Sequence, residues 1–156
     1  MNIHLAKANE LKKIDTLIEV STKQLQVEFY SPEIIEEALE LVTEIKQMVL
    51  EHTLFVAENT GNIVACGGYR NIEKGLNAEL KAFFVHPLHA RQGLASKILV
   101  KCIEKLKAER VKELCLVATL AGEPFYRTQG FYESERKSIT LSSGASFEVV
   151  NMHRSL

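Results

Sequence analysis

Tryptophan is absent from the 156 residues, and cysteine, proline and methionine occur only three times each. Cys66, Cys102 and Cys115 stand inside apolar periodic segments, without the spacing of a disulfide framework or of a metal site. Disulfides persist mainly in oxidising compartments. We therefore expect three buried, reduced thiols in a cytoplasmic protein.

Long apolar runs and an excess of one charge are also missing. No stretch approaches the ~18 consecutive apolar residues of a membrane span, and the first residues lack the apolar core of a signal peptide. The chain carries 19 basic and 20 acidic residues, a formal net charge of −1, so it has no overall basic field that would attract nucleic acid. We expect one globular domain over residues 1–156, without a membrane or nucleic-acid partner.

The stretch from residue 79 to residue 96 carries the most informative pattern. Residues 80–85 are apolar at five of six positions, which predicts a buried strand, and Pro87 ends it. Gly93 then begins a predicted helix. The first N–H groups of a helix have no internal partner, and a glycine lets an anion approach the backbone closely. This strand, loop and helix, with Arg91 as a neighbouring cation, therefore predict a phosphate-binding site.

Two common nucleotide-binding motifs do not fit this loop. The dinucleotide fingerprint needs three glycines, whereas Gly93 stands alone, and the nucleoside-triphosphate loop needs Gly-Lys-Ser/Thr, whereas the chain has Gly-Leu-Ala-Ser. Residues 90–95 instead resemble the pyrophosphate loop of the GNAT superfamily of N-acetyltransferases, which reads Arg/Gln-x-x-Gly-x-Gly/Ala. Gly93 and Ala95 match that pattern, and Ala90 departs from it.

A second segment carries the same resemblance. Residues 125–131 read Phe-Tyr-Arg-Thr-Gln-Gly-Phe, similar to the phrase Phe-Tyr-x-x-x-Gly-Phe that GNAT members commonly have after their fifth strand. One predicted helix and one predicted strand separate the two motifs, as in the family. The pair of motifs is therefore more specific than the loop alone.

The remaining pattern predicts a mixed α/β (α+β) fold. Apolar or alternating runs predict strands at residues 2–7, 53–58, 62–70, 79–85, 114–118, 131–141 and 146–154. Helical periodicity and capping residues predict helices from about residue 10 with Asn9 as the cap, over residues 32–50 after Ser31, over residues 93–110, and briefly from Glu123. The order β-α-α-β-β-β-α-β-α-β-β resembles the GNAT fold, a mixed and mostly antiparallel central sheet flanked by helices.

Gly67 and Gly68 interrupt the third predicted strand. Glycine inside a strand is typical of a bulge or of a close approach by another backbone segment. We expect one of these irregularities at this position.

The resemblance implies acetyl transfer from acetyl-CoA, as co-substrate, to a primary amine of a small molecule or a protein, by direct attack in a ternary complex. It assigns the pantetheine arm to Phe83, Phe84 and Val85, with a backbone donor for the oxyanion near Val85. It assigns binding of the pyrophosphate to six consecutive residues: Arg91, Gln92, Gly93, Leu94, Ala95 and Ser96.

Acid–base roles follow from the same resemblance. Tyr126 is the expected general acid beside the departing thiolate. Glu79 is the expected base, acting through water, and His86 is the alternative because histidine ionises near neutral pH. The loop before the tyrosine motif lacks an asparagine that some relatives use to contact the cofactor, and Thr119 could replace it.

The acceptor and the assembly stay open. The acceptor site is expected at residues 25–32, with Glu28, Phe29 and Tyr30 as candidates, and near residues 142–144. A homodimer is possible, because three apolar residues of the last strand either pack inward or pair across a two-fold axis: Phe147, Val149 and Val150. The alternative to an enzyme is a non-catalytic sensor module that binds acyl-CoA without turnover.

Overall fold

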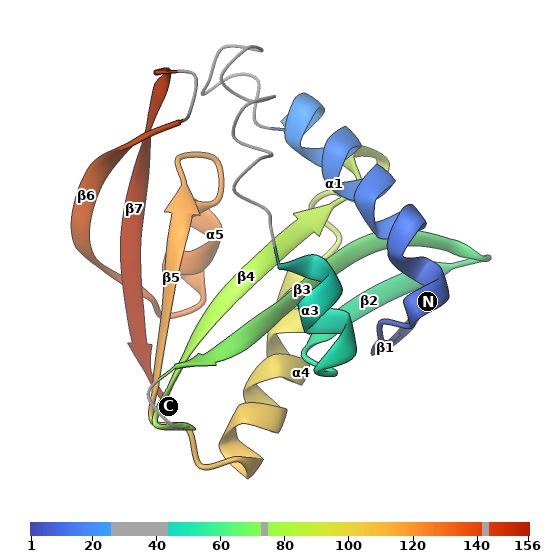
Figure 1. Cartoon of the computed structure of the whole chain (residues 1–156), viewed down its shortest axis with the longest axis horizontal. Helices are drawn as coiled ribbons and strands as arrows, with labels where there is room; N and C mark the ends of the chain where they lie inside the picture. The colour runs from blue at the N-terminus through green and yellow to red at the C-terminus, as the bar shows by residue number, and fades with distance from the viewer. Residues whose placement is uncertain (26–43, 73–74, 142–143) are drawn as a thin grey trace.

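Figure 1 shows the fold of the computed structural model, which describes residues 1–25, 44–72, 75–141 and 144–156. Within these residues one sheet has seven strands in the order β1-β2-β3-β4-β5-β7-β6. The strands are β1 (Asn2–Leu5), β2 (Leu54–Asn59), β3 (Asn62–Ile72), β4 (Asn77–Val85), β5 (Glu113–Thr119), β6 (Tyr132–Thr140) and β7 (Ser146–Ser155). The helices are α1 (Leu11–Leu25), α3 (Ile45–Leu50), α4 (Leu94–Ala108) and α5 (Glu123–Thr128), with 3-10 turns η1 (Ala8–Glu10) and η4 (Pro87–His89).

Neighbouring strands run antiparallel except β4 and β5, which are parallel. The expected mixed, mostly antiparallel sheet is therefore confirmed. Of the helix predicted over residues 32–50, only α3 lies within the described residues. Its predicted start at Ser31 lies outside them.

Helices cover both faces of the sheet (Figure 1). Helices α1 and α3 lie over one face of β2, β3 and β4, and α4 lies over the opposite face. The apolar stripe of α4 is buried as its spacing predicts, at Leu94, Ile98, Leu99, Cys102 and Leu106. A second buried cluster joins α1 and α3 to the sheet through Ile14, Leu17, Ile18, Met48 and Val49. Among the described residues no helix is long and apolar enough to cross a membrane.

The parallel pair β4 and β5 is short. Only residues 77–79 of β4 pair with residues 113–115 of β5. The rest of β4 pairs with β3 and the whole of β5 pairs with β7, so the two strands diverge toward their carboxyl ends (Figure 1). Their facing backbone edges are therefore left without a strand partner over most of their length.

The glycine pair in β3 is both a bulge and a close backbone approach, as the sequence predicts. The register of β3 on β4 shifts between Cys66 and Gly68. A side chain at Gly67 would meet the ring of Phe83 at 2.7 Å, and one at Gly68 would meet the Thr53 carbonyl oxygen at 2.2 Å. Both positions therefore require glycine for space.

The first helix begins differently from its prediction. Strand β1 ends at Leu5, and η1 precedes α1. The Lys7 N–H donates to the Glu10 carboxylate at 2.8 Å. Asn9 is therefore not the cap that the sequence suggested, because it lies inside η1, and Lys7 stands in the capping position before that turn.

The apolar residues of the last strand pack inward. Val150 belongs to the main core beside α4, and Phe147 and Val149 form a small cluster with Leu141. These side chains are buried within one chain, so they offer no apolar surface for a two-fold contact. The homodimer stays a prediction without this support.

Alanine at position 68 should destabilise the fold, because its Cβ would lie 2.2 Å from a backbone oxygen that cannot move alone. We expect Gly68→Ala to lower the free energy of unfolding by about 3 kcal/mol, measured by chemical denaturation. Gly61→Ala is the control, since nothing lies within 4 Å of its Cβ and only its φ of +87° is strained. The control should cost about 1 kcal/mol. Equal costs would contradict the close approach.

Candidate active site

A pocket of about 750 Å³ occupies the gap between β4 and β5. It is lined by β4, by the loop and first turn of α4, by β5 and by α5. The structure brings most predicted site residues together here: Phe83, Phe84, Val85, Arg91, Gly93, Leu94, Ala95, Ser96 and Tyr126. Gln92 and Glu79 are not among the described lining residues.

One end of the pocket is the entrance of α4. Gly93 precedes the helix with a left-handed φ of 78°, and nothing lies within 4 Å of the Cβ that it lacks. The Lys97 N–H donates to the Gly93 carbonyl at 3.0 Å and is the first helical bond. The N–H groups of residues 94–96 therefore have no helical acceptor, and with Arg91 they form a cradle for an anion.

The backbone of β4 turns a donor toward the gap. The His86 N–H donates to the Val64 carbonyl at 2.8 Å, and Val85 pairs with Ala65. Successive N–H groups along an antiparallel strand alternate in direction. The Val85 N–H therefore points away from β3, toward the side from which β5 has separated.

The Tyr126 ring lies within an aromatic cluster at the pocket wall. Its centroid is 5.0 Å from that of Phe125, 5.8 Å from that of Phe131 and 6.2 Å from that of Phe83. Burial, with a smaller contribution from Cys102, raises the pKa of Tyr126 above its ordinary value. The phenol is therefore protonated at neutral pH. Its hydroxyl makes no hydrogen bond with the part of the chain that the structure describes.

Two sets of contacts fix α5, and thus Tyr126, against its neighbours. The Glu123 carboxylate meets Arg127 at 2.6 Å and Arg136 of β6 at 2.9 Å. Arg127, and then Arg136, lower the pKa of Glu123. Gln129 donates from Nε2 to the Ser96 hydroxyl at 2.9 Å, so the end of α5 is tied to the start of α4. Sequence reasoning missed this tie, since nothing in the motif pairs these two residues.

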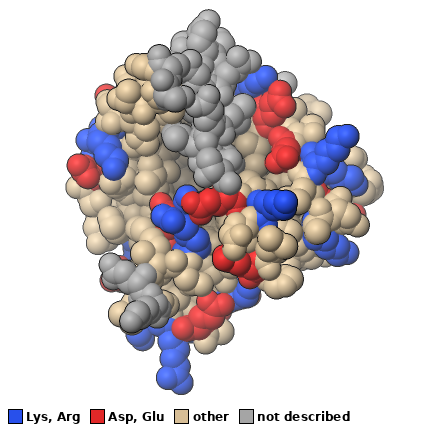
Figure 2. Space-filling model, viewed as in Figure 1, with Lys and Arg blue, Asp and Glu red and all other residues tan. Residues whose placement is uncertain are grey.

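Glu79 faces the side of the sheet that carries α3. Its Oε1 accepts from Arg70 Nε at 2.7 Å and lies 4.0 Å from Lys81 Nζ. Glu44, which precedes α3, completes the cluster at 3.8 Å from Arg70 and 3.5 Å from Lys81. Figure 2 shows basic and acidic side chains side by side across the middle of this face. Oε2 of Glu79 makes no hydrogen bond with the described residues.

His86 lies apart from this pocket. Its Nδ1 accepts from the Leu88 N–H at 3.1 Å, and its ring lines a different pocket beside α1. Thr119 does line the pocket between β4 and β5, and its hydroxyl accepts from the Gly122 N–H at 3.1 Å. The geometry therefore favours Thr119 as a wall residue and separates His86 from the gap.

The cysteines do not line the described pocket. Cys66 and Cys102 are buried, and burial raises the pKa of each thiol to about 12. Cys115 is only half-buried, against the expectation of three buried thiols, because it alternates with Leu114 and Leu116, which face the core beside α4. Burial, and then Glu79, raise the pKa of Cys115 as well. These thiols are poor nucleophiles.

The pocket reaches through the sheet. Ser21 of α1, together with Lys81 and Val117, lines it on the side of α1, whereas Ser96 and Gln129 line it on the side of α4. The predicted acceptor residues Glu28, Phe29 and Tyr30 lie outside the described residues, as do residues 142 and 143. Sequence reasoning missed Ser21, which carries no local motif.

A splayed strand pair, an anion cradle and a half-buried tyrosine in one pocket define a site that can bind a phosphate-containing ligand and support acid–base chemistry. The sequence matches the Acetyltransferase (GNAT) family over residues 18–131, more than half of the chain. The chain therefore belongs to the GNAT acetyltransferase family. No protein of curated function matches it by sequence.

Solved structures agree on the fold. A GCN5-related N-acetyltransferase from Rhodopseudomonas palustris has a TM-score of 0.83 and 17% identity, with 99% of this chain and 95% of that chain covered. A PaiA N-acetyltransferase from Thermoplasma acidophilum, solved with coenzyme A, has a TM-score of 0.75 and 17% identity, with 99% and 98% covered. A ribosomal-protein-alanine N-acetyltransferase from Brucella melitensis has a TM-score of 0.72 and 18% identity, with both chains covered completely.

Family membership confirms two expectations. The protein is an acyltransferase, and acetyl-CoA is its co-substrate, as throughout the family.

Tyr126 should ionise later than an exposed tyrosine. Because its folded pKa is raised, the native state holds the phenol proton more tightly than the unfolded chain does, and stability falls as pH rises above about 10. The measurement is tyrosinate absorbance against pH for wild type, Tyr126→Phe and Tyr132→Phe, the last removing a ring that is 57% exposed. The ionisation lost in Tyr126→Phe should occur at higher pH than that lost in Tyr132→Phe. Coincident ionisations would contradict the assigned burial.

Proposed function

We propose that this chain transfers the acetyl group of acetyl-CoA to a primary amine of a small molecule or a protein, by direct attack in a ternary complex. The observation that carries the proposal is the pocket between β4 and β5, which has an anion cradle at one end and lining residues on both faces of the sheet. The gap can thus hold two ligands, one toward each face.

The residues present fit coenzyme A. The open space at Gly93, the free N–H groups of residues 94–96 and Arg91 suit a pyrophosphate. The unpaired edge of β4 offers amide groups to the pantetheine amides, as a strand partner would. Acetyl-CoA supplies an activated thioester, and every other requirement of the reaction falls on the chain itself.

Stabilisation of negative charge falls to two groups. The Val85 N–H, directed into the gap, is placed to donate to the carbonyl oxygen as it gains charge. The Tyr126 hydroxyl, protonated at neutral pH, is placed to donate its proton to the leaving thiolate. Phe83, Phe125 and Phe131 hold the phenol ring in that position.

Removal of the amine proton falls to Glu79 through water. Oε1 is held by Arg70, whereas Oε2 has no hydrogen bond with the described residues and is open to a water molecule. Lys81, whose ammonium is 4.0 Å from Oε1, lines the pocket and brings this cluster to its edge. His86 lines the other pocket, which supports Glu79 as the better candidate.

Direct attack is favoured over a covalent acetyl-enzyme. No cysteine is among the described lining residues, and the pKa of each of the three thiols is raised. The acceptor class stays wide: among proteins of this fold, one is named for a ribosomal protein and another is an aminoglycoside 6'-N-acetyltransferase.

Initial velocities test the proposal directly. The free thiol released from acetyl-CoA is measured against a panel of polyamines, aminoglycosides and peptides with free N-termini. An acceptor from that panel should give intersecting double-reciprocal lines, as a ternary complex requires. Parallel lines would point to an acetyl-enzyme and overturn direct attack. CoA binding without acceptor-dependent thiol release from any panel member would favour the sensor module.

Tyr126→Phe should lower kcat by about a hundredfold with little change in CoA affinity, because the ring still packs but the proton donor is lost. Kinetics with the best acceptor and calorimetric titration of CoA give the two quantities. Tyr132→Phe, which removes an exposed phenol, is the matched control and should leave both unchanged. Undiminished turnover in Tyr126→Phe would remove the acid role.

Glu79→Gln should lower kcat by about a hundredfold, since the amide cannot accept a proton. The measurement is acceptor-dependent thiol release. His86→Gln, which preserves a polar side chain in the neighbouring pocket, should retain the wild-type kcat. The reverse result would assign the base to His86. An unchanged kcat in both variants would leave only water as the acceptor of the proton.

A further inference from the structure

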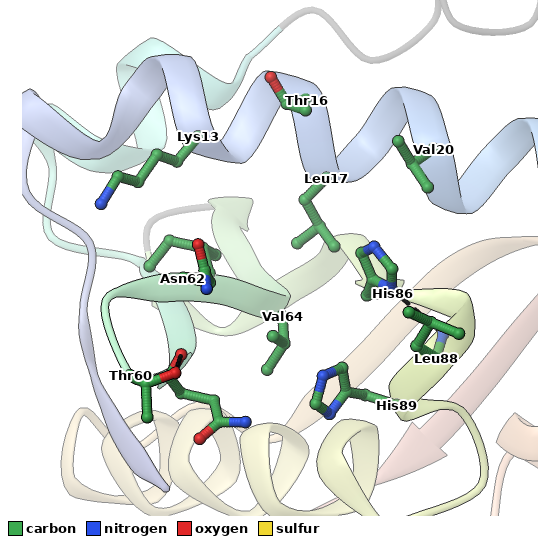
Figure 3. A pocket seen from close by; sticks show the side chains of 12 residues that line it. Lys13, Thr16, Leu17, Val20, Thr60, Asn62, Val64, His86, Leu88 and His89 are labelled. Atoms are coloured by element: carbon green, nitrogen blue, oxygen red, sulfur yellow. Dashed lines mark hydrogen bonds between the residues drawn. The ribbon is translucent and has the colours of Figure 1, made fainter.

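A second pocket, of about 430 Å³, lies between α1, the β2–β3 hairpin and η4 (Figure 3). It belongs to neither the gap between β4 and β5 nor the charged cluster at Glu79. Figure 3 shows His86 and His89 on one side and Lys13, Thr60 and Asn62 on the other. Leu17 and Val64 lie between them. The pocket is thus polar at both ends and apolar in the middle.

The polar groups that face this pocket offer donors rather than negative charge. Lys13 Nζ donates to the Gly61 carbonyl at 2.7 Å, which leaves two of its three donors without a partner among the described residues. His86 Nδ1 accepts a hydrogen bond from the Leu88 N–H, so neutral His86 carries its proton on Nε2. No Asp or Glu is found among the described lining residues.

One polar atom of the pocket is buried without a partner. His89 Nδ1 has no hydrogen bond with any residue that the structure describes. A buried polar atom without a hydrogen bond destabilises the fold, so such an atom often marks the place of a ligand or a water molecule. The ring of His89 points from η4 toward Val64 and the hairpin, into the pocket (Figure 3).

The rim of this pocket carries an exposed apolar side chain, Leu88. Leu88 lines the pocket and is 81% exposed, the highest value among the exposed large apolar residues of the described chain. A ligand with an apolar body would bury part of Leu88 and extend the surface of Leu17 and Val64. Water molecules could make hydrogen bonds at the polar ends of the pocket, but they would not bury Leu88.

We propose that this pocket is a second ligand site, which binds a small carboxylate with an apolar chain. The carboxylate accepts a hydrogen bond from Lys13, and the chain lies along Leu17 and Val64 toward the imidazoles of His86 and His89. An amine of the same length would meet Lys13 and find no described acid to pair with. The site needs neither acetyl-CoA nor catalysis, so its failure would be distinct from failure of the proposed function.

The test is a titration with hexanoate at pH 7, followed by the imidazole nitrogen signals in NMR. The chain has five histidines, few enough to assign each by a single substitution to glutamine. Hexanoate should shift the signals of His86 and His89 saturably, while those of His4, His52 and His153 stay in place. Hexan-1-amine and hexan-1-ol are the matched probes and should leave all five unchanged. An equal response to the alcohol, a shift that does not saturate or no shift at His89 would overturn the proposal.

Two lysine variants and competition with CoA test where the carboxylate binds. Lys13→Met should raise the Kd of hexanoate about tenfold, as expected for loss of one charged donor. Lys12→Met, an exposed neighbour on α1 outside the pocket, should leave Kd unchanged. Saturating CoA should not abolish the His89 shift. Equal effects of the two lysine variants, or displacement of hexanoate by CoA, would place it elsewhere and contradict the assignment.

Discussion

Separation of β4 from β5 is the constraint on which the rest of the site depends. The two strands share only three paired positions, after which β4 is held by β3 and β5 by β7. The outer edge of each strand is paired, apart from one bulge between β3 and β4, so the sheet stays continuous while the facing edges are open. Backbone N–H and C=O groups need partners. An open gap within a sheet is thus a surface to which a ligand can bind.

Contacts between residues on the two sides of the gap fix the positions of the side chains that line it. Phe83 comes from β4 and Tyr126 from the helix after β5, and their rings meet edge to face. Gln129 joins the end of α5 to Ser96 at the start of α4. The anion cradle and the phenol therefore hold a fixed relation although they belong to opposite sides of the gap. On the face of the sheet that carries α1 and α3, the ion pairs around Glu79 lie where β4 and β5 begin to separate.

The sequence predicts the fold well because its strands and helices have clear periods, and the loop and tyrosine motifs locate most of the pocket lining. It does not predict what depends on contacts between distant residues. The ion pair of Arg70 with Glu79 and the bond of Gln129 to Ser96 join positions that no local pattern links. The Asn9 cap is wrong because the helical turn begins earlier, with Lys7 in the capping position and Asn9 inside η1. The second pocket is invisible to motifs, since α1, a hairpin and a turn each contribute a few ordinary residues.

We propose that the gap between β4 and β5 binds coenzyme A. A thermal-shift titration measures this binding, since a ligand that binds only the native state raises Tm by mass action. Acetyl-CoA and CoA should raise Tm in a concentration-dependent way, and NAD and ATP should not. No shift at millimolar CoA, or equal shifts with all four ligands, would contradict the account.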